Sequence, residues 1–78
     1  MNVEHHPLVH EFPEHRETLH RLKLSDTHFA RLAAEYEDVD KEIVRIEDAI
    51  EAASDVTLET LKKRRLLLKD QLYARLIA

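Results

Sequence analysis

The sequence predicts an all-α protein, in which a short N-terminal helix precedes an antiparallel, coiled-coil-like helical hairpin that assembles as a dimer. From Phe29 to Ala53, apolar residues recur at alternating steps of three and four, the a/d heptad pattern of a helix with one narrow apolar stripe. The 78 residues include no Gly, and both Pro precede residue 14, so no helix breaker follows. We therefore expect one helical domain spanning residues 1–78.

The N-terminal part divides into a His-rich arm, residues 1–12, and a short amphipathic helix, residues 13–24. Pro7 suits the first turn of a short helical piece, and Pro13 suits a second helix start. Phe12, Leu19 and Leu22 keep heptad spacing, which gives the short helix one apolar face.

Two long helices follow, over residues 26–53 and 57–77, with a break around Ser54 to Thr57. Ser25 and Asp26 are good N-caps for the first helix, and Ser54, Asp55 or Thr57 for the second. A short connection makes the two helices antiparallel neighbours. The expected seam between them is formed by Phe29, Leu32, Tyr36, Val39, Ile43, Ile46, Ile50, Leu58, Leu61, Leu68 and Leu72.

Charge supports this pairing, because residues 26–53 carry nine acids and three bases whereas residues 54–78 carry six bases and three acids. We expect the acids at the end of the first helix to meet the basic start of the second. Exposed ion pairs contribute only about 0–1 kcal/mol each, so the pattern selects orientation more than it stabilises.

The second long helix has more apolar surface than a hairpin buries. Leu66, Tyr73 and Ile77 widen its stripe, and Leu67 lies apart from it. Burying one large apolar side chain is worth about 1.5–3 kcal/mol, so we expect this surface to meet a second copy, as a two-fold dimer, or a partner protein. We expect the N-terminal helix to fold back over part of this surface and a second copy to cover the rest.

Arg65 occupies a seam position between Leu61 and Leu68, where an apolar residue is expected. A charge there can fix the register by pairing across the seam, with Asp40 as a possible partner. Alternatively, Arg65 lays its methylenes over the seam and keeps its head in water. The sequence leaves both readings open.

Two further groups of residues suggest other roles. All six His lie between residues 5 and 28, and His6 and His10 have the i, i+4 spacing of a helical metal pair, so the arm is either solvated, a weak metal site or a pH responder. The basic run Lys62, Lys63, Arg64 and Arg65 is a candidate contact for nucleic-acid phosphates. Consecutive residues on a helix point in all directions, however, so nucleic-acid association is the alternative hypothesis and an interaction module is the leading one.

Composition also excludes several classes of function. Without Cys there is no thiol nucleophile or Cys-ligated zinc, and without Gly no phosphate-cradling loop. A helical hairpin of this size has almost no interior in which to desolvate a reacting group. No stretch reaches the roughly 20 apolar residues of a membrane span. We expect a non-enzymatic protein of the cytoplasm, without cofactor or membrane partner, that acts as an interaction or adaptor module.

Several segments resemble the YdcH-like family, small bacterial proteins of unknown function. They are Phe12-Pro13-Glu14-His15-Arg16, Leu19-His20-Arg21-Leu22-Lys23, His28-Phe29, Val39-Asp40-Lys41-Glu42-Ile43, Leu61-Lys62-Lys63 and Leu67-Leu68-Lys69-Asp70. The resemblance implies a small helical, coiled-coil-like protein of the cytoplasm, and it carries over no catalytic residues.

Overall fold

The structure, a computed structural model, describes residues 5–48 and 54–78, and these residues form helices and connecting segments without a strand. The all-α prediction is confirmed for this part of the chain. In chain order the elements are α1 (Leu8–Glu11), the 3-10 helix η1 (Pro13–His15), α2 (Arg16–Ser25), α3 (Thr27–Glu47) and α4 (Asp55–Leu76).

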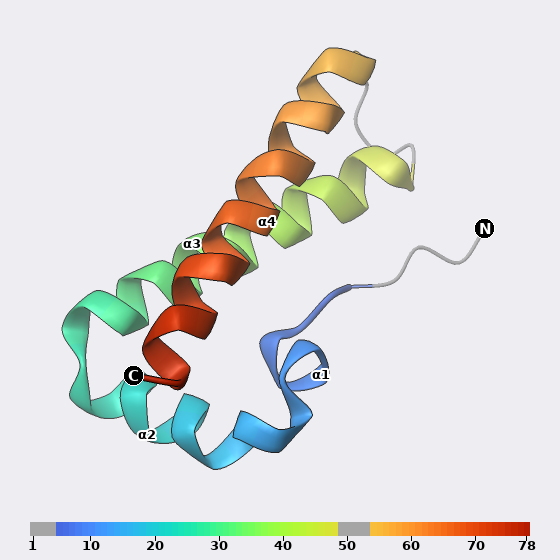
Figure 1. The fold of residues 1–78 in the computed structure, drawn as a ribbon. Coiled ribbons are helices and arrows are strands. Elements are labelled where there is room, and N and C mark those ends of the chain that lie inside the picture. Colours follow the sequence, from blue (N-terminus) through green and yellow to red (C-terminus); the bar gives the residue numbers. More distant parts are fainter. Residues whose placement is uncertain (1–4, 49–53) are drawn as a thin grey trace.

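The two long helices, α3 and α4, lie side by side in opposite directions and make the predicted hairpin (Figure 1). Ion pairs connect them along its length, as the charge difference predicted. Arg75 meets Asp26 at 3.1 Å, Arg65 meets Asp40 at 2.8 Å and Lys62 meets Glu47 at 3.3 Å. In these pairs the residue numbers rise along α3 as they fall along α4. The ion pairs therefore also show that the two helices are antiparallel.

Side chains cap the beginning of both long helices. Asp26 Oδ1 accepts a hydrogen bond from the Phe29 backbone N–H at 3.1 Å, and Ser54 Oγ accepts one from the Thr57 N–H at 3.2 Å. With Ser54 as the cap, α4 begins at Asp55, two residues before the expected start, and it ends one residue before the expected Ile77. Helix α3 is described up to Glu47, and the predicted extension to residue 53 includes residues 49–53, which lie outside the described residues.

The buried core contains much of the predicted seam and also extends beyond it on one side. Phe29, Tyr36 and Ile43 are fully buried along the middle of α3, with Leu68 and Leu72 opposite them on α4. The remaining seam residues fall into three groups: Val39 is buried, Leu32, Ile46, Leu58 and Leu61 are half-buried, and Ile50 lies outside the described residues.

The additional width of the core comes from Ala33 and Asp40, which are buried on one flank of the α3 seam. These two positions follow Phe29 and Tyr36 by four residues, so they lie beside the seam on the same helix face. A two-helix hairpin leaves such a flank open to solvent. A third layer must therefore cover it.

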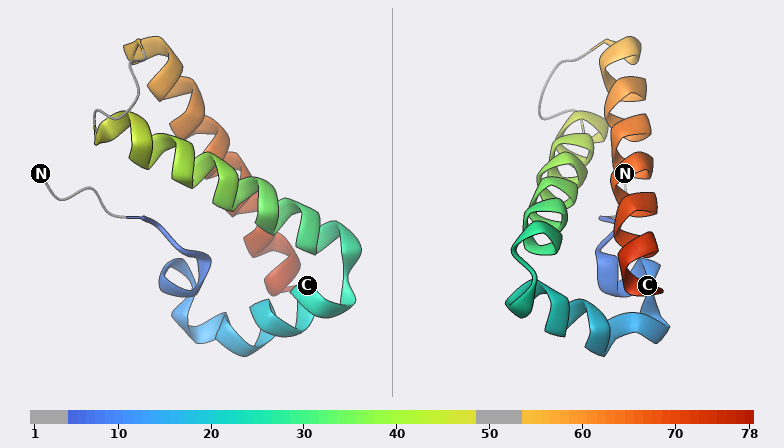
Figure 2. Two further views of the ribbon diagram at one scale, coloured as in Figure 1. Left: turned by 180° about the vertical axis from the view of Figure 1, so that it is seen from behind. Right: turned by 60° about the vertical axis from the view of Figure 1, so that its left-hand side comes forward.

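The N-terminal segments form that layer. Helix α2 crosses the open end of the hairpin, and α1 and the extended residues before it turn back along the hairpin (Figure 2). Leu8, Phe12 and Leu19 from these segments join the hydrophobic core. The expected helix over 13–24 is divided into η1 and α2, and Pro13 stands at the first position of η1. The interpretation of the arm as wholly solvated does not hold for residues 5–12.

Candidate functional site

The densest group of polar contacts in the described structure is centred on Asp40. Asp40 is the only charged side chain buried among residues 5–48 and 54–78, with an exposed fraction of 4%. Its Oδ1 accepts a 2.8 Å bond from Arg65 Nη1, and its Oδ2 accepts a 3.0 Å bond from the His6 backbone N–H. His5 Nδ1 lies 3.1 Å from the same Oδ2. A buried carboxylate requires such partners, because burying a charge alone is costly.

Arg65 therefore pairs across the seam, which decides between the two readings of this residue. Its side chain is 16% exposed and reaches the Asp40 carboxylate instead of lying free in water. A charge pair at this depth fits one register of the hairpin, because sliding either helix by one turn would leave both charges buried without a partner. The sequence identified both residues but did not show that they lie at the same level along the hairpin.

Tyr36, one turn before Asp40 on α3, also bonds to the backbone of His6. Its hydroxyl donates a 2.6 Å hydrogen bond to the His6 backbone C=O, and burial raises the pKa of its phenol well above the ordinary value of 10.0. The phenol thus stays protonated and acts as a donor. The backbone of His6 is therefore held at both its N–H and its C=O by side chains of α3.

The contacts of α1 with α4 complete the arrangement. Lys69 Nζ donates a 2.9 Å bond to Glu11 Oε1, and this bond is the largest cause of the lowered pKa of Glu11. The Phe12 and Tyr73 rings are stacked, with centroids 5.5 Å apart. Leu8 and Phe12 are each only 6% exposed. Sequence reasoning assigned Phe12 to the apolar face of the 13–24 helix and missed Leu8, although the i, i+4 spacing of the two residues next to Pro7 was a visible signal of one short amphipathic turn.

The contacts of this cluster hold the N-terminal segment in place on the hairpin. Both Asp40 oxygens are engaged and the Tyr36 hydroxyl is committed to a carbonyl. No buried side-chain nitrogen or oxygen among the described residues lacks a hydrogen-bond partner.

The basic run of α4 is largely neutralised by α3. Lys62 pairs with Glu47 at 3.3 Å, Arg64 with Glu35 at 3.2 Å, and Arg65 with Asp40. Lys63 is the member of the run for which the described part of the chain supplies no ion-pair partner. The four side chains therefore do not form a free positive patch of the kind that contacts phosphates.

Five of the six His lie in the N-terminal layer, and His28 lies in the first turn of α3. His6 and His10, the candidate metal pair, are both exposed, and His6 Nδ1 lies 3.7 Å from Glu11 Oε1. Within residues 5–48 and 54–78, no group of three or more His, Asp or Glu side chains is arranged to hold a metal ion.

The predicted association surface is exposed on α4. Leu66, Leu67, Tyr73 and Ile77 have exposed fractions of 59%, 58%, 43% and 58%. At about 100° per residue, Leu66, Tyr73 and Ile77 form one stripe, whereas Leu67 points away from it. Phe12 covers one face of Tyr73, so the N-terminal layer covers part of this stripe and leaves the rest exposed.

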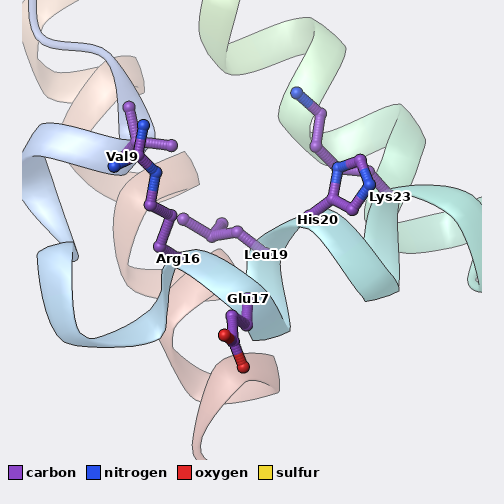
Figure 3. Close-up of a pocket in the computed structure, with 6 residues that line it drawn as sticks. All are labelled: Val9, Arg16, Glu17, Leu19, His20 and Lys23. Atoms are coloured by element: carbon purple, nitrogen blue, oxygen red, sulfur yellow. The ribbon is translucent and has the colours of Figure 1, made fainter.

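A shallow cavity of about 430 Å³ lies between α1 and α2 (Figure 3). Val9 and Leu19 give it an apolar floor, and Arg16, His20 and Lys23 stand around its rim. The Glu17 carboxylate points away from the other labelled side chains. Lys23 is already paired with Glu37 at 3.2 Å. The charge at this cavity is therefore small.

None of the helices in the described residues combines the length and apolar character needed to cross a bilayer. No curated protein and no solved structure matches the sequence. The sequence model of a family described as "Protein of unknown function (DUF465)" matches residues 29–76, which include nearly all of the hairpin. The chain therefore belongs to DUF465, a family of small bacterial proteins of unknown function that includes YdcH, as its resemblance to the YdcH-like family predicted.

Proposed function

We propose that this protein is a non-enzymatic helical module that associates with a second copy of itself through an exposed apolar stripe on α4. The stripe, defined by Leu66, Tyr73 and Ile77, is the observation that carries the proposal. Each of these side chains is between 43% and 59% exposed. Scattered apolar residues are normal on protein surfaces, but three large ones on one helix face, with Asp70 between Leu66 and Tyr73, are typical of an interaction site.

The spacing of the stripe suits a helix as its partner. Its members are seven and four residues apart, the spacing at which apolar residues recur along a coiled-coil contact. Completing their burial is worth about 2–4 kcal/mol per protomer, since a large apolar side chain gains about 1.5–3 kcal/mol on full burial and these are about half exposed. A two-fold dimer uses the stripe twice, because an isologous interface presents the same patch on both protomers.

The remaining features support an interaction module over an enzyme. The buried polar groups bond to one another, and the ion pairs of the basic run are internal to the hairpin. The other surfaces offer little concentrated chemistry. A rigid hairpin with one exposed apolar stripe is well suited to helix–helix recognition.

Sedimentation at micromolar concentration tests the proposal, with Leu66→Glu as the disrupting variant. We expect the wild-type chain to sediment as a dimer and Leu66→Glu as a monomer of 9.2 kDa. Leu67→Glu is the matched control, because Leu67 is equally exposed but points away from the stripe. A monomeric wild type, or equal loss of association in both variants, would contradict the proposal.

A further inference from the structure

We propose that the α3–α4 groove that holds residues 5–12 is a peptide-binding groove, and that its resident N-terminal segment can be replaced by a segment of a partner protein. The matching segment has three non-helical residues followed by one helical turn. That turn presents two apolar side chains four positions apart and a carboxylate directly before the second. The inference goes beyond self-association through the α4 stripe.

The groove recognises the backbone of its occupant. The Asp40 carboxylate accepts the His6 N–H at 3.0 Å, and the Tyr36 hydroxyl donates to the His6 C=O at 2.6 Å. Both contacts are made to backbone atoms of His6, so any residue except proline can stand at that position. Peptide-binding domains commonly combine main-chain bonds, which give affinity, with side-chain pockets, which give specificity.

Side chains of the helical turn supply the specificity. Leu8 and Phe12 are each 6% exposed, and the Phe12 ring stacks on Tyr73. Glu11 bonds to Lys69 at 2.9 Å, which favours a carboxylate at this position. Val9 and His10, between the anchors, are exposed. The pattern of inward and outward positions resembles a short recognition motif more than a uniformly packed helix.

The groove keeps its main internal contact when the segment leaves. Asp40 retains its 2.8 Å bond to Arg65, so its charge remains paired. Two cavities flank the segment, although its anchors Leu8 and Phe12 are buried. A cavity of about 370 Å³ opens beside His5 and Pro7, and another of about 150 Å³ lies beside His6 and Glu11. Tyr36 lines both cavities, so solvent can reach the groove on either side of the segment.

The family model matches the helices that form the groove but not the segment that occupies it. The side chains that form the groove are Tyr36, Asp40, Arg65, Lys69 and Tyr73, and all of them lie within the 29–76 range matched by the family model. The resident segment lies outside that range. A groove built entirely from the matched hairpin is suited to take its ligand from elsewhere in this chain or from another protein.

Fluorescence anisotropy with a labelled synthetic peptide of residues 5–15 tests the inference. The resident segment competes at an effective concentration of the order of millimolar, so the peptide should bind wild-type chain weakly. In the full chain carrying Leu8→Ala and Phe12→Ala, which weakens the resident segment, we expect at least tenfold tighter binding. The peptide carrying the same two changes should not bind either chain.

A charge reversal identifies the groove as the binding site. In the doubly substituted chain, Lys69→Glu should weaken peptide binding at least fivefold, and a peptide carrying Glu11→Lys should recover it. Lys63→Glu is the matched control, because Lys63 is an exposed lysine of α4 without a contact to the segment, and it should leave binding unchanged.

Three results would overturn the inference. The first is no peptide binding to a doubly substituted chain whose far-UV circular dichroism remains helical. The second is unfolding of that chain, which would make the segment an integral part of the core. The third is failure of the Glu11→Lys peptide to recover binding to the Lys69→Glu chain.

Discussion

Removing either partner of the Asp40–Arg65 pair is expected to destabilise the hairpin far more than removing a similar pair at its surface. The Asp40 side chain is 5% exposed and that of Arg65 is 16% exposed. The Arg64–Glu35 pair joins the same two helices at 3.2 Å, with side chains 57% and 42% exposed. The two pairs therefore differ chiefly in burial, which makes the second a matched control.

The expected loss of stability depends on which charged group each substitution leaves without its partner. Breaking a buried pair typically costs about 3–5 kcal/mol, because the remaining charge stays buried. Arg65→Ala leaves Asp40 with the His6 N–H, and Asp40→Ala leaves an arginine near solvent, so we expect about 3 kcal/mol for each. A hydrogen bond between charged groups is worth about 1.5–3 kcal/mol, so the coupling energy of the pair should be about 2 kcal/mol.

Urea unfolding of both single variants and the double variant, followed by circular dichroism at 222 nm, measures this coupling energy. The same cycle on Glu35 and Arg64 should give less than about 0.5 kcal/mol. Equal coupling in the two cycles, or coupling near zero for Asp40 and Arg65, would refute the view that this pair fixes the register.

Three further predictions concern the stability of the fold. Ile43→Ala, at a fully buried position, should lower the free energy of unfolding by about 3 kcal/mol in urea titrations, whereas Ile77→Ala at the surface should change it little. Ser54→Ala should cost about 1 kcal/mol in the same assay through loss of the α4 cap, and a cost of zero would mean that the cap is not formed. Since the Lys69 hydrogen bond lowers the pKa of Glu11 from its ordinary 4.5, its contribution is present above about pH 4.5 and is lost as the pH falls through the lowered value. Glu11→Gln should flatten that part of the stability–pH curve, and an unchanged curve would show that the pair contributes nothing.

The hairpin was predictable from sequence because its signals are local and repetitive. The three-and-four spacing from Phe29 to Ile43 defines a helix face without knowledge of the partner. Asp26 and Ser54 are capping residues at the observed helix starts. The acidic and basic halves indicated the direction of pairing. Each of these inferences needs only neighbours along the chain or the average charge of a helix.

The cluster around Asp40 was only partly predictable, because it depends on the relative height of two helices. Asp40 and Arg65 were both identified, but whether they meet is set by the connection between α3 and α4. The docking of residues 5–12 was missed for a similar reason. The contact of Phe12 with Tyr73 joins positions 61 apart in the sequence, and no local pattern specifies that distance.

The His-rich composition of the arm also obscured the apolar anchors. His5, His6 and His10 suggested a solvated segment, yet the contacts that hold it use the backbone of His6 and the side chains of Leu8 and Phe12. A search for isolated i, i+4 apolar pairs beside a helix-starting proline would have found the docked turn.

Docking of the N-terminal segment on the hairpin is tested most directly by nuclear Overhauser effects between the aromatic rings of Phe12 and Tyr73. With centroids 5.5 Å apart, their ring protons should give clear cross-peaks in the wild-type chain. Absence of these cross-peaks, in a sample whose α3 and α4 amide resonances show a folded hairpin, would contradict the docked arrangement.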